Sequence, residues 1–333
     1  MTFTITETDR ARLAEPSSGD VPAIQAEGLR KVYGDVVAIE SLSFTVAQGE
    51  VFGFLGPNGA GKSTTVKVLT GLARPTSGDA RLLGRKLGNR QVKKQIGYLP
   101  ELFRFHDWLT AREFLDIHGR LAGMSGSERE SRIPEALELV GLSGRGDHRL
   151  RTFSKGMQQR AGLAQALLHR PRLIFLDEPT SALDPIGRRI VRDVIRDLSA
   201  SGTTIFLNSH LLSEVEMVCD RVAILNRGVL VAAGRLDELR LQGVSVVLRV
   251  GGWSVELAAI ANGIGDVETR EPVDDSMALV TVVLPSQDQI PLLVVRLVEG
   301  GGRIYEVASH QETLEELFVN LVDQSDGMDF SAP

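Results

Sequence analysis

A glycine-rich segment, FLGPNGAGKSTTVKVLTGL, places a lysine and a serine directly after a run of small residues. It contains the pattern Gly-x4-Gly-Lys-Ser between an apolar run that predicts a strand and a segment that predicts a helix. Glycines allow backbone N–H groups to turn toward phosphate oxygens, and the start of the helix adds the positive end of its dipole. In such a loop Lys62 pairs with β- and γ-phosphates, and the Ser63 hydroxyl is a ligand for Mg²⁺. The segment therefore predicts a nucleotide-binding loop and not merely a turn between strand and helix. The predicted contacts are Gly56, Pro57, Asn58, Gly59, Ala60, Gly61, Lys62, Ser63 and Thr64.

The segment LIFLDEP places two acids at the end of an apolar strand. Ligands bind at the carboxyl ends of the strands in open α/β sheets, where Asp177 can hold Mg²⁺. Glu178 is the candidate general base that polarises water for attack on the γ-phosphate. The alternative is a pair of solvated acids at a strand end. A P-loop with an acidic strand occurs in kinases, GTPases, helicases and transport ATPases, so these two motifs alone leave the reaction open.

Two kinds of element pattern follow one another along the chain. Short β-rich runs alternate with helical patterns up to about Leu239, which predicts an α/β sheet with helices on both faces. Three consecutive helical patterns between Thr110 and Leu168 interrupt this alternation and indicate an inserted helical subdomain. The predicted divisions are a flexible tail (1–20), a main domain (21–240) with its helical subdomain (about 102–170), a small α+β domain (241–325) and a second tail (326–333).

Composition limits the function classes. The 333 residues, 43% of them hydrophobic, predict a globular chain with two domains. A formal net charge of −6 argues against nucleic acid as the main partner, because phosphate neutralisation needs a concentrated basic surface. The single cysteine, Cys219, excludes an internal disulfide, fits a reducing cytoplasm and is expected to be a buried filler. No stretch approaches the ~18 apolar residues of a membrane span, so we expect that the chain does not cross a bilayer by itself.

Five segments resemble the ATP-binding-cassette (ABC) family in their order and approximate spacing, over about Ile24–Leu239. They are the P-loop, the helical region, TFSKGMQQR, LIFLDEPTSALD and LNSHLLSEVE. In that family, the helix after an LSGGQ-like motif presents its N-terminus to the γ-phosphate of a nucleotide held by the opposite subunit. Phe153, Ser154, Lys155, Gly156 and Met157 occupy the five places of that motif.

The resemblance implies nucleotide contacts for Ser154, Lys155 and Gly156. Lys155 stands where the motif has a glycine, and Met157 where it has a glutamine. The lysine either adds positive charge toward phosphate or faces solvent. The same Ser-Lys-Gly-Met run looks like the exporter branch of the family that includes drug, sodium and polysaccharide systems.

Four further positions match motifs of the family. His210 resembles the switch histidine that contacts the γ-phosphate and steadies Glu178 and the attacking water. Asp184 resembles the aspartate that links the two sites of a dimer, and Asp-Pro also suits the start of a helix. Tyr33 matches the aromatic residue that stacks on adenine, with a core tyrosine as the alternative. Glu101 stands where the family usually has a glutamine that reaches Mg²⁺ and senses the membrane partner. Its carboxylate can ligate Mg²⁺ but adds negative charge beside the triphosphate.

The segment LFRFHDWLT follows Glu101 and bunches three aromatic residues, Phe103, Phe105 and Trp108, in a chain that is only 5% aromatic. Such anchors suit a groove that receives a short helix of a membrane subunit, as in the family. The alternative is packing inside the helical subdomain.

The resemblance implies an ATP-hydrolysing subunit of an ABC transporter that uses ATP and Mg²⁺. Its implied partners are a second ATPase subunit, expected to be another copy, and an integral membrane permease. Its implied place is the cytoplasmic face of the cell membrane, and the implied direction of transport is export. A soluble ABC ATPase with a non-transport role is an alternative, opposed by the single cassette and the lack of a long coiled-coil insertion. A regulatory module with little turnover is another, opposed by Glu178 and His210.

The region after about Gly243 has no nucleotide motif and resembles the C-terminal domain of some exporter ATPases. Its last helical pattern has an apolar face that we expect to be intramolecular core, formed by Leu314, Leu317, Phe318 and Leu321.

Overall fold

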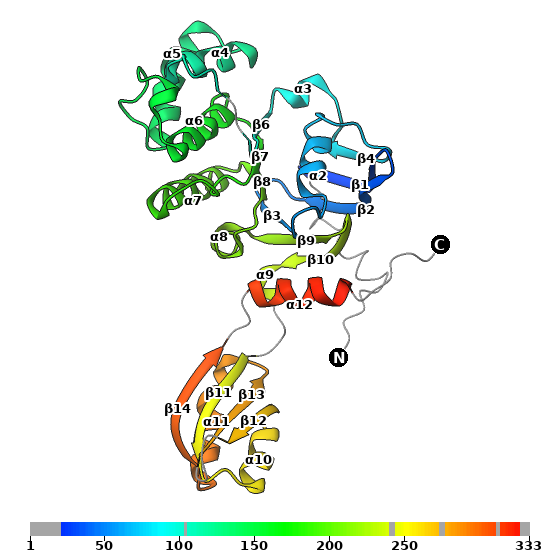
Figure 1. Ribbon diagram of the computed structural model, residues 1–333, viewed down its shortest axis with the longest axis vertical. Helices are drawn as coiled ribbons and strands as arrows, with labels where there is room; N and C mark the ends of the chain where they lie inside the picture. Colours follow the sequence, from blue (N-terminus) through cyan, green and yellow to red (C-terminus); the bar gives the residue numbers. More distant parts are fainter. Residues whose placement is uncertain (1–20, 103–104, 240–243, 273–276, 311–313, 327–333) are drawn as a thin grey trace. The chain divides into compact units, whose positions relative to one another are not determined.

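The computed structural model describes residues 21–102, 105–239, 244–272, 277–310 and 314–326. It contains two compact units (Figure 1). Unit 1 holds the described residues up to Leu236 and from Asn320 onward, and unit 2 is Asp237–Val319. Two helices, α9 (Leu236–Leu239) and α12 (Leu314–Asp326), therefore cross the boundaries between the units.

Unit 1 is built on a ten-stranded sheet in the order β5-β4-β1-β2-β10-β9-β3-β8-β7-β6. The strands are β1 (Ile24–Tyr33), β2 (Val36–Val46), β3 (Val51–Leu55), β4 (Ser77–Leu82), β5 (Arg85–Lys86), β6 (Ile96–Leu99), β7 (Leu173–Asp177), β8 (Thr204–Asn208), β9 (Arg221–Asn226) and β10 (Val229–Arg235). Neighbours from β9 through β3, β8 and β7 to β6 pair in parallel. Every residue of β3, β7 and β8 is buried, as expected for strands covered on both faces. The predicted α/β core is confirmed.

The antiparallel strands β1, β2, β4 and β5 lie at the other end of this sheet and were not distinguished in the sequence. Their residues alternate irregularly between buried and exposed, and register shifts interrupt the pairing of β1 with β2. A strand that is partly exposed and bulged lacks the continuous apolar run that identified β3, β7 and β8.

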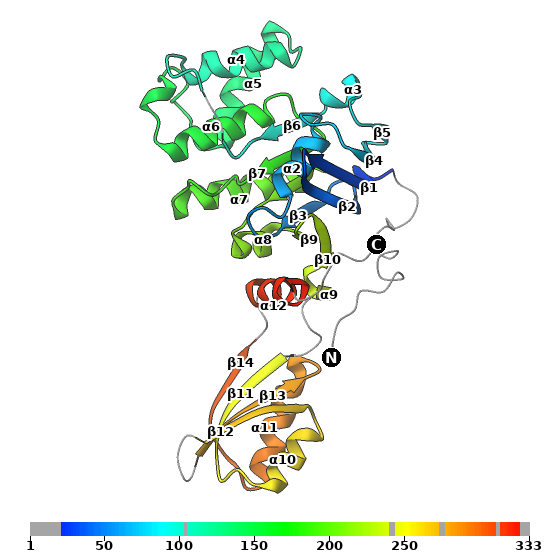
Figure 2. The ribbon, with the colours of Figure 1, turned by 45° about the vertical axis from the view of Figure 1, so that its right-hand side comes forward.

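The helices of unit 1 fall into two groups (Figure 2). The first flanks the sheet and consists of α2 (Lys62–Leu69), α3 (Arg90–Lys93), α7 (Pro185–Ala200) and α8 (Leu212–Val218). The second is the inserted group α4 (Ala111–Leu121), α5 (Gly126–Leu139) and α6 (Lys155–Leu167), with a short 3₁₀ turn at Leu150–Thr152 before α6. No strand separates these three helices in the described sequence between β6 and β7. Cys219 directly follows α8 and is buried, as predicted.

An aromatic core holds the three strands that end at the functional motifs. The Phe206 ring of β8 lies 5.0 Å from Phe54 of β3 and 5.4 Å from Phe175 of β7, centroid to centroid. Each of these rings lies two residues before a position of interest, namely Gly56, Asn208 and Asp177. Such aromatic contacts contribute about 0.5–1.5 kcal/mol each beyond the burial of their surface. The carboxyl ends of β3, β7 and β8 are thus fixed relative to one another by the packing directly below them.

Unit 2 has a four-stranded antiparallel sheet in the order β12-β13-β11-β14. Along the chain the elements are β11 (Val244–Gly251), α10 (Val255–Asn262), β12 (Asp266–Pro272), β13 (Met277–Leu284), a 3₁₀ turn (Gln287–Gln289), α11 (Ile290–Glu299) and β14 (Arg303–His310). This is a βαββαβ arrangement of the ferredoxin-like kind. Leu257 and Ala261 of α10 and Leu293 and Leu297 of α11 are buried with the inward-facing residues of β11 and β13. In α12, Leu314 and Leu317 are buried.

Two elements of unit 2, α10 and β12, were not predicted. The α10 helix has only eight residues, of which three are alanines and one is an asparagine, so its apolar period is weak. β12 carries Asp266, Glu268, Arg270 and Glu271 on an edge of the sheet, where charged residues are common but give no apolar signal.

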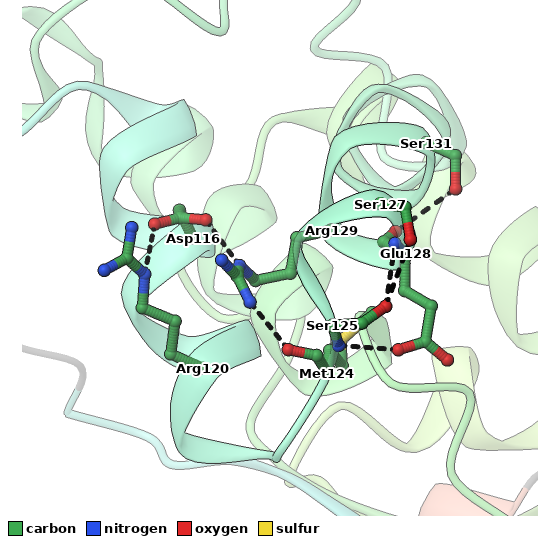
Figure 3. Close-up of polar contacts among 8 residues, drawn as sticks. All are labelled: Asp116, Arg120, Met124, Ser125, Ser127, Glu128, Arg129 and Ser131. Carbon is green, nitrogen blue, oxygen red and sulfur yellow. Dashed lines mark hydrogen bonds and ion pairs between the residues drawn. The ribbon is translucent and has the colours of Figure 1, made fainter.

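Polar contacts fix the turn between α4 and α5 (Figure 3). The Asp116 carboxylate accepts from Nε of Arg120 at 2.7 Å and from Nε of Arg129 at 2.6 Å. Arg129 also donates from Nη1 to the Met124 carbonyl at 2.6 Å. A capping box closes the start of α5, in which the Ser125 N–H donates to the Glu128 carboxylate at 2.6 Å. Asp116 therefore ties α4 to the first turn of α5.

We expect Asp116→Ala to lower the free energy of unfolding by about 1 kcal/mol, because it leaves the mostly buried Arg129 without its carboxylate partner. The hydrogen bond from Arg129 holds the pKa of Asp116 below its usual value. This contribution is therefore present above the unfolded-state pKa of about 3.9 and is lost as the pH falls through the lower folded-state pKa. Urea unfolding of both proteins at neutral and acidic pH measures the difference.

The control for Asp116→Ala is Asp147→Ala, which breaks the exposed pair of Asp147 with Arg112, at 3.0 Å. The Arg112 side chain is 48% exposed and that of Arg129 is 15% exposed, so water screens the control pair more strongly. We expect the control to change stability by at most about 0.5 kcal/mol. Equal losses of unfolding free energy in the two variants would contradict a larger contribution from the contact of Asp116 with Arg129.

Candidate ATP site

The P-loop joins β3 to α2, and its glycines are required by their surroundings. Gly61 is the N-cap of α2 with φ of 101°, and Gly56 has φ of 156°. A Cβ atom at Gly61 would overlap the Ala38 carbonyl oxygen, and one at Gly56 would overlap the Leu225 carbonyl oxygen. These positions combine left-handed or near-extended positive φ with close backbone approach, so only glycine fits without a shift. The loop is therefore pressed against β2 and β9 and not free to rearrange.

Lys62 begins α2 and lies over the loop. It is buried, and its Nζ donates to the Gly56 carbonyl at 2.6 Å and the Pro57 carbonyl at 3.1 Å. Burial lowers the pKa of Lys62, while the carboxylates of Glu178, Asp177 and Glu101 act in the opposite direction. All three predicted acids therefore lie close enough to Lys62 to favour its charged form.

Asp177 ends β7 and pairs in register with Asn208, which ends β8. Both side chains are buried, and Nδ2 of Asn208 donates to Oδ1 of Asp177. Burial is the largest cause of a raised pKa for Asp177, which Asn208 opposes and Glu101 and Glu178 reinforce. Sequence reasoning missed Asn208. Its only signal is a polar residue at the end of the apolar run TTIFLN, and nothing in that run indicates which strand lies beside it.

Glu178 follows Asp177 with a left-handed backbone, at φ of 53°. This conformation costs roughly 1–2 kcal/mol for a residue with a side chain, so its surroundings must hold it. The Glu178 N–H donates to the Asn208 carbonyl at 2.9 Å, and its own carbonyl accepts from Ser181 Oγ at 3.1 Å and Gln159 Nε2 at 3.3 Å. Gln159, on α6, was not anticipated from the sequence. These contacts hold the strained backbone of Glu178 in place.

The Glu178 carboxylate is buried and meets His210. Its Oε2 atom lies 2.7 Å from Nδ1 of His210, an attractive contact when the imidazole is protonated. No donor among the described residues makes an aligned hydrogen bond to this oxygen. His210 itself is exposed and stands two residues beyond β8. A basic oxygen held beside a histidine and near a phosphate-binding loop can orient and deprotonate a water molecule.

The Ser154 segment lies against the loop that contains Asp184. The Ser154 hydroxyl accepts from the Met157 N–H at 3.2 Å and caps α6. A Cβ atom added at Gly156 would lie 3.2 Å from Cδ2 of Leu183, so the start of α6 packs closely on this loop. Asp184 caps α7 by accepting from the Gly187 N–H at 2.7 Å, which confirms the helix-start reading of Asp-Pro. Lys155 is exposed.

Three predicted positions lie at the edges of this arrangement. Tyr33 ends β1, is 46% exposed and has Nζ of Lys31 above its ring at 4.4 Å, so it is not a core tyrosine. Glu101 is exposed and adds to the field at Asp177 and Lys62. It also contributes, after burial and Asp177, to raising the pKa of Tyr98 to about 12.

The donor chemistry of the site fits Mg²⁺ bound together with nucleotide. The described residues contain no cluster of three or more His, Cys, Asp or Glu that could form a protein cage for a metal. Mg²⁺ does not require one, because it keeps several waters and binds through one or two carboxylates and substrate phosphates. Asp177 is a buried carboxylate at the carboxyl end of β7, and Ser63 follows Lys62 in the first turn of α2.

A glycine-constrained P-loop after β3, an acid at the end of β7, which β8 separates from β3 in the sheet, and a carboxylate–histidine pair define a P-loop nucleoside triphosphatase. The family model for ABC transporters matches residues 39–181. An uncharacterized ABC transporter ATP-binding protein of Nostoc sp. (strain PCC 7120) is 42% identical over 325 residues, covering 91% of this chain and 90% of that protein. The chain therefore belongs to the family of ABC transporter ATP-binding proteins, and it is an ATPase subunit that binds ATP.

Two further likenesses come from an export system and from a solved structure. Nod factor export ATP-binding protein I of Rhizobium sp. (strain N33) is 40% identical over 242 residues, covering 72% of this chain and 80% of that protein. A dimeric ATP-binding cassette in a post-hydrolysis state, bound to ADP and Pi, matches with a TM-score of 0.60 and 26% identity. That match covers 64% of this chain and 98% of the cassette. No helix in the described part of the chain is both long and apolar enough to span a membrane.

Proposed function

We propose that this ATPase drives export through a separate integral membrane subunit by closing as a dimer around two Mg·ATP. The observation that carries the proposal is the buried Glu178 carboxylate, held 2.7 Å from His210 and electrostatically coupled to Lys62 of the P-loop. A site that only held nucleotide would need the loop but not this strained acid beside a histidine. The export relative supports the direction of transport.

In the proposed mechanism, Glu178 takes a proton from the attacking water and His210 orients both the water and the carboxylate. General base catalysis of this kind contributes roughly 10²–10⁴-fold. Lys62 and the N–H groups of the loop from Gly56 to Thr64 bind the β- and γ-phosphates. Ser63 and Asp177, with Glu101 beside them, would hold Mg²⁺, which offsets phosphate charge when bound. Tyr33 stacks on the adenine, because its exposed ring offers an aromatic face.

The Ser154 segment is proposed to act on the nucleotide of a second subunit. Figures 1 and 2 draw α2, which follows the P-loop, beside β1 and β2, and they draw α6, which follows Ser154, beside α4 and α5. The P-loop and the Ser154 segment therefore belong to different parts of unit 1. The start of α6 offers N–H groups and the positive end of a helix dipole to an anion. Lys155, exposed in the first turn, adds a positive charge there. Asp184, in the adjoining loop, is proposed to link the two sites.

A membrane permease is the second proposed partner, with the ATPase at the cytoplasmic face of the membrane. Leu102 is 84% exposed directly after Glu101, and Trp108 is 67% exposed with its ring tilted against that of His106 at 4.8 Å, centroid to centroid. Phe105 instead packs edge-on against Phe114 of α4 at 5.5 Å, and Phe103 lies outside the described residues. Leu102 and Trp108 therefore provide the apolar anchors that a short permease helix would cover, and Glu101 beside them would report its position.

Light scattering of the Glu178→Gln protein tests closure, because slow hydrolysis would preserve an ATP-bound dimer. We expect Mg·ATP to convert monomer to dimer. Two variants added to this background share the helix-capping ability of Ser154, since Asp and Asn are both good N-caps. Ser154→Asn is expected to keep the dimer, and Ser154→Asp to abolish it by placing a carboxylate against the γ-phosphate. Equal dimerisation of the two variants would contradict the proposed role of this segment.

A further inference from the structure

Asn208 links the two acids of the ATP site, and we infer that it is a positioning residue for both Asp177 and Glu178. Asn208 and Asp177 are register partners at the ends of the parallel strands β8 and β7. The Asn208 amide donates from Nδ2 to Oδ1 of Asp177. An ionised carboxylate only accepts hydrogen bonds, so the amide fixes which oxygen of Asp177 stays available to a cation. This inference rests on the proposed role of Asp177 as a Mg²⁺ ligand.

The main chain of Asn208 restrains the second acid. Its carbonyl accepts from the Glu178 N–H at 2.9 Å, directly at the residue whose φ is 53°. The side chain of Asn208 thus orients the proposed metal ligand while its backbone holds the turn that aims the proposed base. A change in where β8 ends would move both acids together.

Packing within the apolar strand does not explain an asparagine at this position. Asn208 is 1% exposed, and within the described residues its Oδ1 atom has no hydrogen-bond partner. A buried polar atom left unpaired costs about 1–3 kcal/mol, so a leucine of similar volume would suit this apolar strand better. The other four residues of β8 are Thr204, Ile205, Phe206 and Leu207, all buried. The contact of the amide with Asp177 therefore accounts for the asparagine.

Asn208→Leu removes the donor while keeping the volume. In the full chain, the affinity for a non-hydrolysable ATP analogue is measured against free Mg²⁺ and also in EDTA. We expect the Mg²⁺ concentration for the half-maximal effect to rise about tenfold or more, while the affinity in EDTA changes by less than about twofold. Thermal stability is measured alongside, because the variant removes the unpaired Oδ1 of Asn208 but also takes a hydrogen bond from the buried Asp177. An unchanged Mg²⁺ dependence would overturn the inference.

Asn208→Ala is a second variant that loses the same donor but leaves a cavity. We expect the same shift in Mg²⁺ dependence despite lower stability, and a shift in the leucine variant alone would overturn the inference because bulk would then be the cause. Thr204→Val is the matched control. It removes a buried hydroxyl at the other end of β8, which accepts from the Gly49 N–H at 2.9 Å. This control should lose stability and keep the wild-type Mg²⁺ dependence.

Asp177→Asn separates this inference from the proposed function on which it rests. If Asp177→Asn leaves the Mg²⁺ dependence unchanged, Asp177 is not the ligand and the proposed site fails. If Asp177→Asn shifts the dependence but Asn208→Leu does not, only the role of Asn208 is overturned. A shift in both, with none in Thr204→Val, supports the two assignments together.

Discussion

Glu178→Gln is expected to reduce ATP turnover by at least about 100-fold while ATP remains bound. Glutamine keeps the volume of the buried side chain, but an amide cannot take a proton from water. The contact of Oε2 with Nδ1 of His210 would also lose its charge attraction. Steady-state phosphate release measures turnover, and titration with a fluorescent ATP analogue measures binding.

Glu50→Gln is the matched control for this substitution. Glu50 is equally buried, accepts from the Ala47 N–H at 2.6 Å and pairs with Arg221 at 3.2 Å. It is in the turn that leads into β3, at the end of the strand opposite to the P-loop. We expect its variant to lose stability and to keep turnover within about twofold. Undiminished turnover in Glu178→Gln would reject Glu178 as the general base.

Lys62→Ala should weaken ATP binding itself, by about 10- to 100-fold. A hydrogen bond between a buried ammonium and phosphate contributes about 1.5–3 kcal/mol, and its loss leaves the neighbouring carboxylates to repel the triphosphate. Burial lowers the pKa of Lys62, and Glu178, Asp177 and Glu101 raise it, so these carboxylates favour the charged form. Equilibrium titration with a fluorescent ATP analogue measures the change.

Lys86→Ala is the control for the loss of a lysine. Lys86 is exposed on β5 and makes a long ion pair with Asp79 at 3.7 Å, so its removal should leave ATP affinity unchanged. An ATP affinity in Lys62→Ala equal to that of Lys86→Ala would remove Lys62 from the phosphate site. Turnover is not a substitute for this measurement, since it would fall whether binding or chemistry were impaired.

The fold was predictable where a single element carried its own signal. The buried strands β3, β7 and β8 each contain a continuous apolar run, and the inserted helices α4 and α5 each begin with a capping box. The antiparallel strands of unit 1 and the short α10 lack such a signal, because their residues are partly exposed or small. Pairing with neighbouring strands makes these strands regular, and α10 packs through Leu257 and Ala261 on the core of unit 2.

The candidate site likewise has features that the sequence predicts and features that only tertiary contacts decide. The P-loop is one contiguous segment, so its residue types and spacing state its chemistry directly. Asp177 and Glu178 were visible as acids ending an apolar run, but their different surroundings were not. Only the structure gives Glu178 a left-handed backbone with hydrogen-bond partners from α6, β8 and the loop after β7.

The amino-acid sequence by itself determined the nucleotide loop, the acidic strand end and the order of motifs that marks the family, since each motif is a contiguous segment and their order is that of the chain. Tertiary structure alone decided that Asn208 meets Asp177, that Gln159 meets Glu178 and that Oε2 of Glu178 faces His210. These contacts join residues 19 to 32 positions apart. They depend on which strands are neighbours and in what register they pair, and hydrophobic pattern does not specify either.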